Sequence, residues 1–102
     1  MAMEIIREKF LGSKAVDVAL KTDDGWVAYE TQLPGSVRAE LLKDMIAKDL
    51  RAGFIKVFVS VVTKDDRKKT EAVIAEMAED SAFSDLVGLK EKVQAKLLAD
   101  FL

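Results

Sequence analysis

The spacing of apolar residues along the first half of the chain predicts both helices and strands. Residues 3–11 and 37–52 carry apolar residues at helical spacing, and a glycine follows each stretch. Residues 14–22 and 26–33 instead alternate apolar and polar residues, which is typical of strands with one buried face. The sequence Asp23-Asp24-Gly25 between them is a strong signal for a tight hairpin turn.

The second half continues this alternation of elements. Residues 54–63 are apolar on both faces and rich in β-branched side chains, as in an interior strand. Helical spacing returns in residues 65–80 and 90–102, and residues 83–89 are compatible with a short edge strand. We therefore predict one α/β domain over residues 1–102. Its small mixed sheet contains the N-terminal hairpin and one or two further strands, flanked by helices.

The hairpin brings polar side chains together if its turn has two residues. With Asp24-Gly25 as the turn, Asp17 lies opposite Gln32 and Ala19 opposite Glu30. Asp17, Glu30 and Gln32 then share one face, and two carboxylates at diagonal spacing, roughly 7–8 Å, can hold one ion. A three-residue turn would move Asp17 to the opposite face.

The residues around these acids leave two interpretations open. Small side chains, Ala15, Ala19 and Ala28, share the face of the acids. The opposite face carries the larger apolar residues, namely Val16, Val18, Leu20, Val27, Tyr29 and Leu33. We therefore expect that opposite face to be core and the acid face to be open. The acids then either bind a divalent cation with water completing its shell, or form the solvated outer face of a hairpin.

Composition restricts the chemistry that is available. The chain of 102 residues has neither cysteine nor histidine, which excludes disulfides, thiolate nucleophiles and imidazole bases. An oxygen-only site favours a hard cation such as magnesium or manganese. The net charge of −2 gives no overall basic field. With no apolar run of membrane length and charges near the N-terminus, we expect a cytoplasmic protein without membrane contact. Met1-Ala2 before Met3 is typical of a cloning remnant, so we also consider the chain a fragment of a longer protein.

One pattern resembles a known family. Asp17, twelve residues containing a turn, Glu30-Thr31-Gln32, a helix and a buried strand together resemble the PD-(D/E)XK nuclease-like superfamily. The motif is short, and its specificity comes from the element order over residues 3–63. The resemblance implies a restriction-endonuclease-like core in which Asp17 and Glu30 bind magnesium or manganese, and in which DNA is the substrate. The metal would polarise the scissile phosphate and activate the attacking water.

The chain also departs from the family pattern. Gln32 stands where a lysine is usual; it can orient a water but brings no charge, and Lys43 or Lys14 is a candidate source of that charge. Glu8, more than Glu4, is a candidate for the glutamate of the family's first helix. The family's strand before the aspartate is expected to be missing. Two functions follow: metal-dependent DNA phosphodiester hydrolysis, or a non-catalytic partner-binding or dimerisation module of a larger DNA-processing protein.

Overall fold

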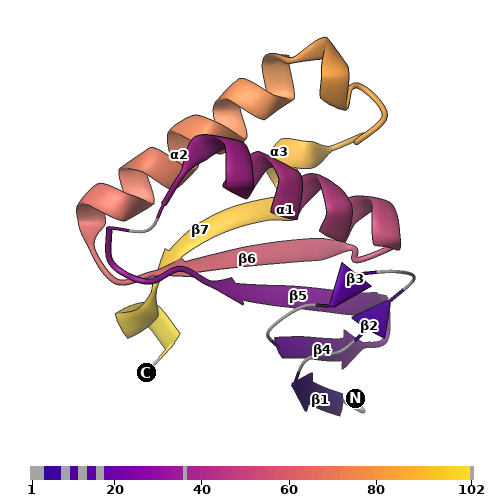
Figure 1. Cartoon of the computed structure of the whole chain (residues 1–102). Helices are drawn as coiled ribbons and strands as arrows, with labels where there is room; N and C mark the ends of the chain where they lie inside the picture. The colour runs from indigo at the N-terminus through magenta and orange to yellow at the C-terminus, as the bar shows by residue number, and fades with distance from the viewer. Residues whose placement is uncertain (1–3, 8–9, 12–13, 16–17, 36, 102) are drawn as a thin grey trace.

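The chain forms a mixed β-sheet with helices packed against one face (Figure 1). The computed structural model describes residues 4–7, 10–11, 14–15, 18–35 and 37–101. In the described chain, the main sheet has the order β1-β4-β5-β6-β7, with bounds β1 Glu4–Arg7, β4 Val18–Thr22, β5 Gly25–Thr31, β6 Lys56–Val61 and β7 Val93–Leu97. β1, β4 and β5 pair antiparallel, whereas β5, β6 and β7 pair parallel. The predicted α/β class with a mixed sheet around an N-terminal hairpin is confirmed.

One side of this sheet carries α1 Ala39–Ala52, α2 Lys64–Glu79, η1 Ser81–Phe83 and α3 Leu89–Lys92. The short helix η2 Leu98–Phe101 follows β7 and lies apart from them. α1 ends at Gly53, which adopts the left-handed conformation and donates its N–H to the last carbonyls of the helix. α2 begins at Thr63, whose side chain accepts from the Asp66 N–H. No helix in the described part of the chain is long and apolar enough to cross a membrane.

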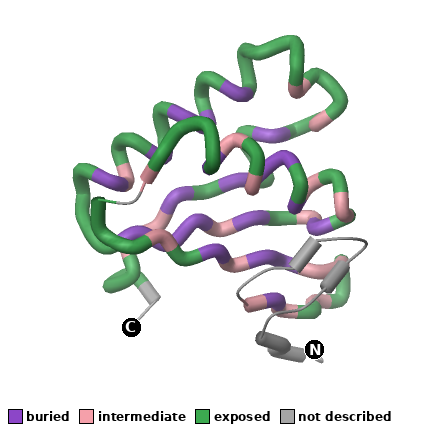
Figure 2. The backbone as a smooth tube through the Cα atoms, in the orientation of Figure 1, coloured by how far each residue is buried: buried purple, intermediate pink, exposed green. Residues whose placement is uncertain are grey.

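The core lies between α1, α2 and the sheet face that they cover (Figure 2). Leu42 and Ile46 of α1 point inward and are at most 2 % exposed. They meet strand residues at alternate positions, which are Ala19, Ala28, Val57, Val59, Val61, Val93 and Ala95. Apolar residues that repeat with the helical period of 3.6 residues therefore pack against apolar residues that repeat with the strand period of two, and together they form one apolar layer.

The prediction of a helix over residues 3–11 is wrong. Glu4–Arg7 is strand β1 and pairs antiparallel with β4. Phe10–Leu11 (β2) and Lys14–Ala15 (β3) form a second, two-stranded sheet, and β3 contacts α1. A nine-residue helix is marginal by itself, whereas β4 offers a full edge of backbone groups. β1 also provides a strand before β4, which the sequence was expected to lack.

The prediction of a helix over residues 90–102 and a strand over 83–89 is also wrong. Leu89–Lys92 is α-helical, Val93–Leu97 continues as β7, parallel to β6, and Leu98–Phe101 is the short helix η2. The segment before α3 contains η1 and turns instead of a strand. Val93 and Leu97, four positions apart, fit a helical period as well as a strand period. β7 forms hydrogen bonds with the backbone groups at the edge of β6.

The turn of the hairpin between β4 and β5 is Asp23-Asp24, one residue earlier than the predicted Asp24-Gly25. Thr22 pairs with Gly25, and Ala19 faces Ala28 instead of Glu30. The Thr22 hydroxyl closes the turn, because it donates to the Gly25 carbonyl at 2.9 Å and accepts from the Asp24 N–H at 3.3 Å. The register differs from the predicted one by an even number of residues, so the described side chains of β4 and β5 are grouped on the two faces as predicted.

Candidate functional site

Glu30 is an acid on an otherwise apolar sheet face. It is the Cα partner of Val59 on β6, and Val59 in turn pairs with Ala95 on β7. Its exposed fraction is 4 %, and Ala28, two residues earlier on the same face, is fully buried. Among the described residues of β4 to β7, Glu30 is the one carboxylate that alternates onto the helix-covered face.

The prediction that the acid face is open is wrong, and the opposite face is core only in part, since Val27 on it is 6 % exposed. Ala19, Ala28 and Glu30 lie under the helices, whereas Tyr29 is half-buried and Leu33 is 71 % exposed. Alanines allow helices to approach the sheet closely, and the large side chains of α1 and α2 fill the layer from the other side. Side-chain size on the hairpin alone therefore did not indicate which face is buried.

Gln32 lies next to Glu30 on the same side of the sheet. Its backbone N–H donates to the Ser60 carbonyl at 2.9 Å, which extends the ladder beyond the last residue of β5. Its Nε2 lies 3.8 Å from Sδ of Met45 on α1. The structure thus places two of the predicted site residues, Glu30 and Gln32, two positions apart beside the helix layer.

Lys43 is engaged elsewhere. Its Nζ lies 2.6 Å from Oε1 of Glu76, so the pair connects α1 to α2. The hydrogen bond that Lys43 donates to the Glu76 carboxylate raises the pKa of Lys43 above its ordinary value, so the amine stays protonated at neutral pH. Lys43 as the source of the charge that Gln32 lacks stays a prediction, and its ammonium is paired with Glu76 of α2 in this structure.

The other predicted site residues cannot be located. Asp17 and Glu8 lie outside the described residues, as do the side chains of Glu4 and Lys14. Asp17 immediately precedes Val18, whose Cα partner is Tyr29, the neighbour of Glu30.

The oxygen atoms of the described site residues are of the type that a hard cation prefers, but they are fewer than its usual number of ligands. Glu30 and Gln32 offer carboxylate and carboxamide oxygens, which suit Mg²⁺ or Mn²⁺. Within the described ranges, no three His, Cys, Asp or Glu residues come together as a metal cluster. Mg²⁺ commonly binds through one or two carboxylates and retains several waters. Asp17 as the second carboxylate of a site at Glu30 stays a prediction.

Two buried acids on the helices were not considered from the sequence. Asp49 of α1 is 0 % exposed and Asp66 of α2 is 4 % exposed. Asp66 Oδ2 accepts from the Gly35 N–H at 3.2 Å, which ties the segment after β5 to α2 and so supports the position of Gln32. The helical period could have identified Asp49, because positions 42, 46 and 49 face the same way.

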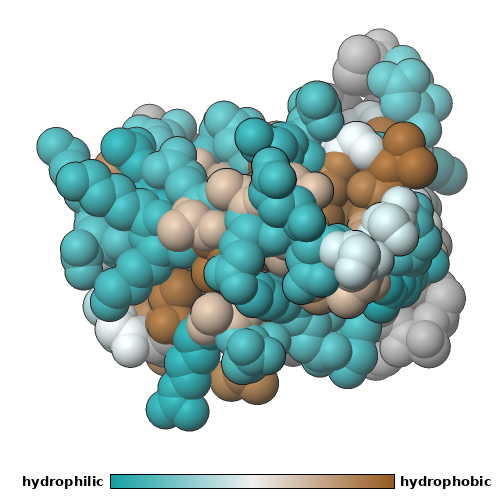
Figure 3. Space-filling view, turned by 90° about the horizontal axis from the view of Figure 1, so that it is seen from above, coloured by the Kyte–Doolittle hydropathy of each residue, from teal (hydrophilic) through white to brown (hydrophobic). Residues whose placement is uncertain are grey.

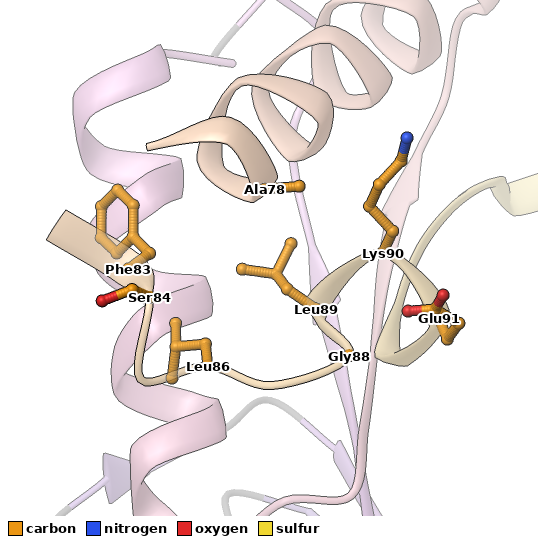
Figure 4. A pocket seen from close by; sticks show the side chains of 8 residues that line it. All are labelled: Ala78, Phe83, Ser84, Leu86, Gly88, Leu89, Lys90 and Glu91. Carbon is orange, nitrogen blue, oxygen red and sulfur yellow. The ribbon is translucent and has the colours of Figure 1, made fainter. Parts of the chain in front are cut away.

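A hollow of about 330 Å³ lies beyond the end of α2 (Figure 4). Phe83, Leu86 and Leu89 give it apolar walls, and Leu89 points toward Ala78 of α2. It contains none of the predicted site residues that the structure describes, so it is separate from Glu30 and Gln32.

Comparisons with known proteins give one structural similarity. No family model and no curated protein matches the chain. A solved structure of SfsA from Pyrococcus furiosus in complex with Ca²⁺ is similar, with a TM-score of 0.49 and 20 % sequence identity. The similar region covers 93 % of this chain and 47 % of that one, so this chain spans about half the length of that protein. The Ca²⁺ belongs to that protein.

Proposed function

We propose that the chain is a nuclease-like domain that hydrolyses DNA phosphodiester bonds with Mg²⁺ or Mn²⁺. The observation that carries the proposal is Glu30, a carboxylate only 4 % exposed at the acidic position of the Glu30-Thr31-Gln32 motif. Gln32 presents a carboxamide two positions along the chain from this carboxylate, and both groups offer the oxygen ligands that a divalent cation of this kind prefers.

Each residue of the proposed site has a separate role. Glu30 holds the cation from β5, and Asp17 supplies the second carboxylate. When bound, the cation polarises the scissile phosphate and lowers the pKa of a coordinated water. Gln32 orients that water through its carboxamide oxygen, while the contact of its Nε2 with Met45 limits rotation of the amide. α1 shields this end of the sheet from bulk water.

Cleavage and thermal stability should be measured together on four purified proteins. These are the wild type, Glu30→Gln, Asp17→Asn, and Glu71→Gln as a control at an exposed acid of α2. With millimolar Mn²⁺, the wild type and Glu71→Gln should nick plasmid or cut single-stranded DNA. A cation at one hundred times its Kd adds about 2.7 kcal/mol of stability, or roughly 10–20 °C in Tm for a domain of this size.

The site variants decide the proposal. Glu30→Gln and Asp17→Asn should lose both the cleavage and the Mn²⁺-dependent rise in Tm, because each removes one anionic ligand and changes little in shape. Cleavage that survives both substitutions at the wild-type rate would refute the assignment, and would point to a contaminating nuclease or to another site.

A non-catalytic partner-binding or dimerisation module is the second candidate. Two observations favour it: Gln32 is packed against Met45, and Lys43 is paired with Glu76. Neither side chain brings a positive charge to Glu30. This candidate predicts a folded wild type that neither cuts DNA nor gains stability from Mn²⁺. A rise in Tm that Asp17→Asn removes would count against it.

A further inference from the structure

The first turns of α2 carry three cations that share one side of the helix. Lys64, Arg67 and Lys68 lie at spacings of three and four residues, so their side chains follow one another along the same face. Lys64 and Lys68 are exposed, and Arg67 is half-buried. The helix side of the molecule, seen in Figure 3, is mostly hydrophilic. A ligand at the start of α2 would therefore meet polar and charged groups.

These three cations form no ion pair with any residue that the structure describes. The acids of the same turn are engaged elsewhere. Asp65 Oδ2 pairs with Lys69 Nζ at 3.6 Å, and Asp66 Oδ2 accepts from the Gly35 N–H at 3.2 Å. Cations near the amino-terminal end of a helix also oppose its dipole. The stability of α2 therefore does not explain why the three charges lie there.

The guanidinium of Arg67 is not anchored by a protein acceptor. Its Nε is buried, and no described residue accepts a hydrogen bond from it. A buried donor without a partner costs free energy, so a ligand that gives this side chain an acceptor gains affinity. Reorientation of the guanidinium toward an anion breaks no side-chain hydrogen bond within the described protein. Its planar set of N–H donors matches the oxygens of a phosphate, which can accept two parallel hydrogen bonds.

This cationic surface lies at the edge of the sheet where the proposed catalytic motif ends. β5 and β6 are adjacent and parallel, so their carboxyl ends lie together, and α2 begins three residues after β6 (Figure 1). Gln32 directly follows β5, and the contact with Asp66 holds Gly35 against α2. A nucleic-acid strand bound at the start of α2 would therefore lie beside the end of the motif.

We propose that Lys64, Arg67 and Lys68 bind the phosphodiester backbone of nucleic acid and hold it at this edge of the sheet. The inference rests on the proposed function, since that function makes nucleic acid the ligand. Arg67 would bind one phosphate, and the two ammoniums, about 6 Å apart along the helix axis, would contact its neighbours. Contacts of this kind position a strand without reading its bases. In a chain of net charge −2, no overall basic field replaces this local charge.

The test measures binding without cleavage. Fluorescence anisotropy follows a labelled duplex and labelled oligothymidylate in EDTA, over a series of salt concentrations. Lys64→Gln, Arg67→Gln and Lys68→Gln each remove one phosphate contact. Each should reduce the slope of log K against log salt by about 0.9 on the duplex and about 0.7 on the single strand. In about 0.1 M salt, each should weaken duplex binding about fivefold to tenfold.

Further variants separate the shape of the guanidinium from its charge. Arg67→Lys should keep the salt slope but lower the affinity, because lysine retains the charge and lacks the planar pair of donors. Lys69→Gln and Lys90→Gln are controls with the same loss of charge. Lys69 is the paired lysine of α2, and Lys90 is an exposed lysine of α3. Both controls should leave the affinity and the slope unchanged.

The outcomes also distinguish this inference from the proposed catalysis. No binding by the wild type, unchanged slopes in the three variants, or equal losses in the two controls would each overturn it. Tighter binding of polyglutamate than of oligothymidylate would also overturn it and would indicate an acidic protein partner. Glu30→Gln should bind normally in EDTA. Binding that needs the three cations, without any Mn²⁺-dependent cleavage, would refute the catalytic function and leave this inference standing. Cleavage that none of the three substitutions affects would do the reverse.

Discussion

Ile46 should determine how firmly α1 docks over Glu30. Its side chain is fully buried between α1 and the sheet. Ile46→Ala removes three carbons, worth about 2.4 kcal/mol of transfer free energy at about 0.8 kcal/mol each. A residual cavity of about 40 Å³ adds about 1 kcal/mol. The free energy of unfolding should therefore fall by about 3.4 kcal/mol, a large part of the 5–15 kcal/mol typical of a domain.

Leu41 provides a matched control on the same helix. It is 64 % exposed, so Leu41→Ala should cost less than about 1 kcal/mol. Urea unfolding followed by far-UV circular dichroism measures both variants, with an unchanged denaturant slope as the check on two-state behaviour. The Tm of Ile46→Ala should fall by about 14–27 °C. Equal losses in the two variants, or a loss below about 1 kcal/mol for Ile46→Ala, would mean that α1 packs through a different face. The burial of Glu30 would then no longer follow.

Three further predictions concern the ends of the helices, the hairpin and the motif. Arg51 donates two hydrogen bonds to the Asp85 carboxylate, and these lower the pKa of Asp85 in the folded protein. The pair therefore stabilises the fold at pH values above the ordinary aspartate pKa. This stabilisation is lost as the pH falls through the lowered pKa of Asp85. Asp85→Asn should thus reduce the Tm slightly at neutral pH and not at all in strong acid, and a gap that persists in acid would contradict this origin. Gly25 has φ 143° and its added Cβ would lie 3.0 Å from Ile55 Cγ2, so Gly25→Ala should cost about 1–3 kcal/mol in urea unfolding; a neutral substitution would disprove the strain. Gln32→Lys would place a cation about 7 Å along the strand from Glu30, an attraction of about 2 kcal/mol at an effective dielectric constant near 20. It should speed Mn²⁺-dependent plasmid nicking about tenfold, and a folded variant with an unchanged rate would argue against a catalytic place for position 32.

The longer elements were predictable from the sequence because each stretch repeats its period often enough to distinguish a helix from a strand. Helical spacing over residues 37–52 and 65–80 corresponds to α1 and α2 within two residues. Alternation on both sides of the Asp23-Asp24-Gly25 turn corresponds to the hairpin, and the β-branched run over 54–63 contains β6. The position of Glu30 on the same face as Ala28 also followed from the strand period.

The terminal segments depended on which partners were available. Residues 4–7 and 93–97 are too short for their spacing to distinguish a helix from a strand. Each segment forms a strand by pairing with the edge of another strand from which other elements separate it in sequence. β1 pairs with β4, and β7 pairs with β6. The backbone N–H and C=O groups at those edges need hydrogen-bond partners. The residues of the terminal segments alone do not show that such an edge is available to them.

By itself the sequence determined the α/β class, the central elements and the set of side chains that share a face with Glu30. Only the tertiary structure decided that this face is the one that the helices cover, whereas Tyr29 and Phe58 on the other face are half-buried. The physical reason is that burial depends on where helices dock. α1 and α2 fit against alanines and valines, so the smaller side chains of the hairpin became its core face, and Glu30 was buried with them.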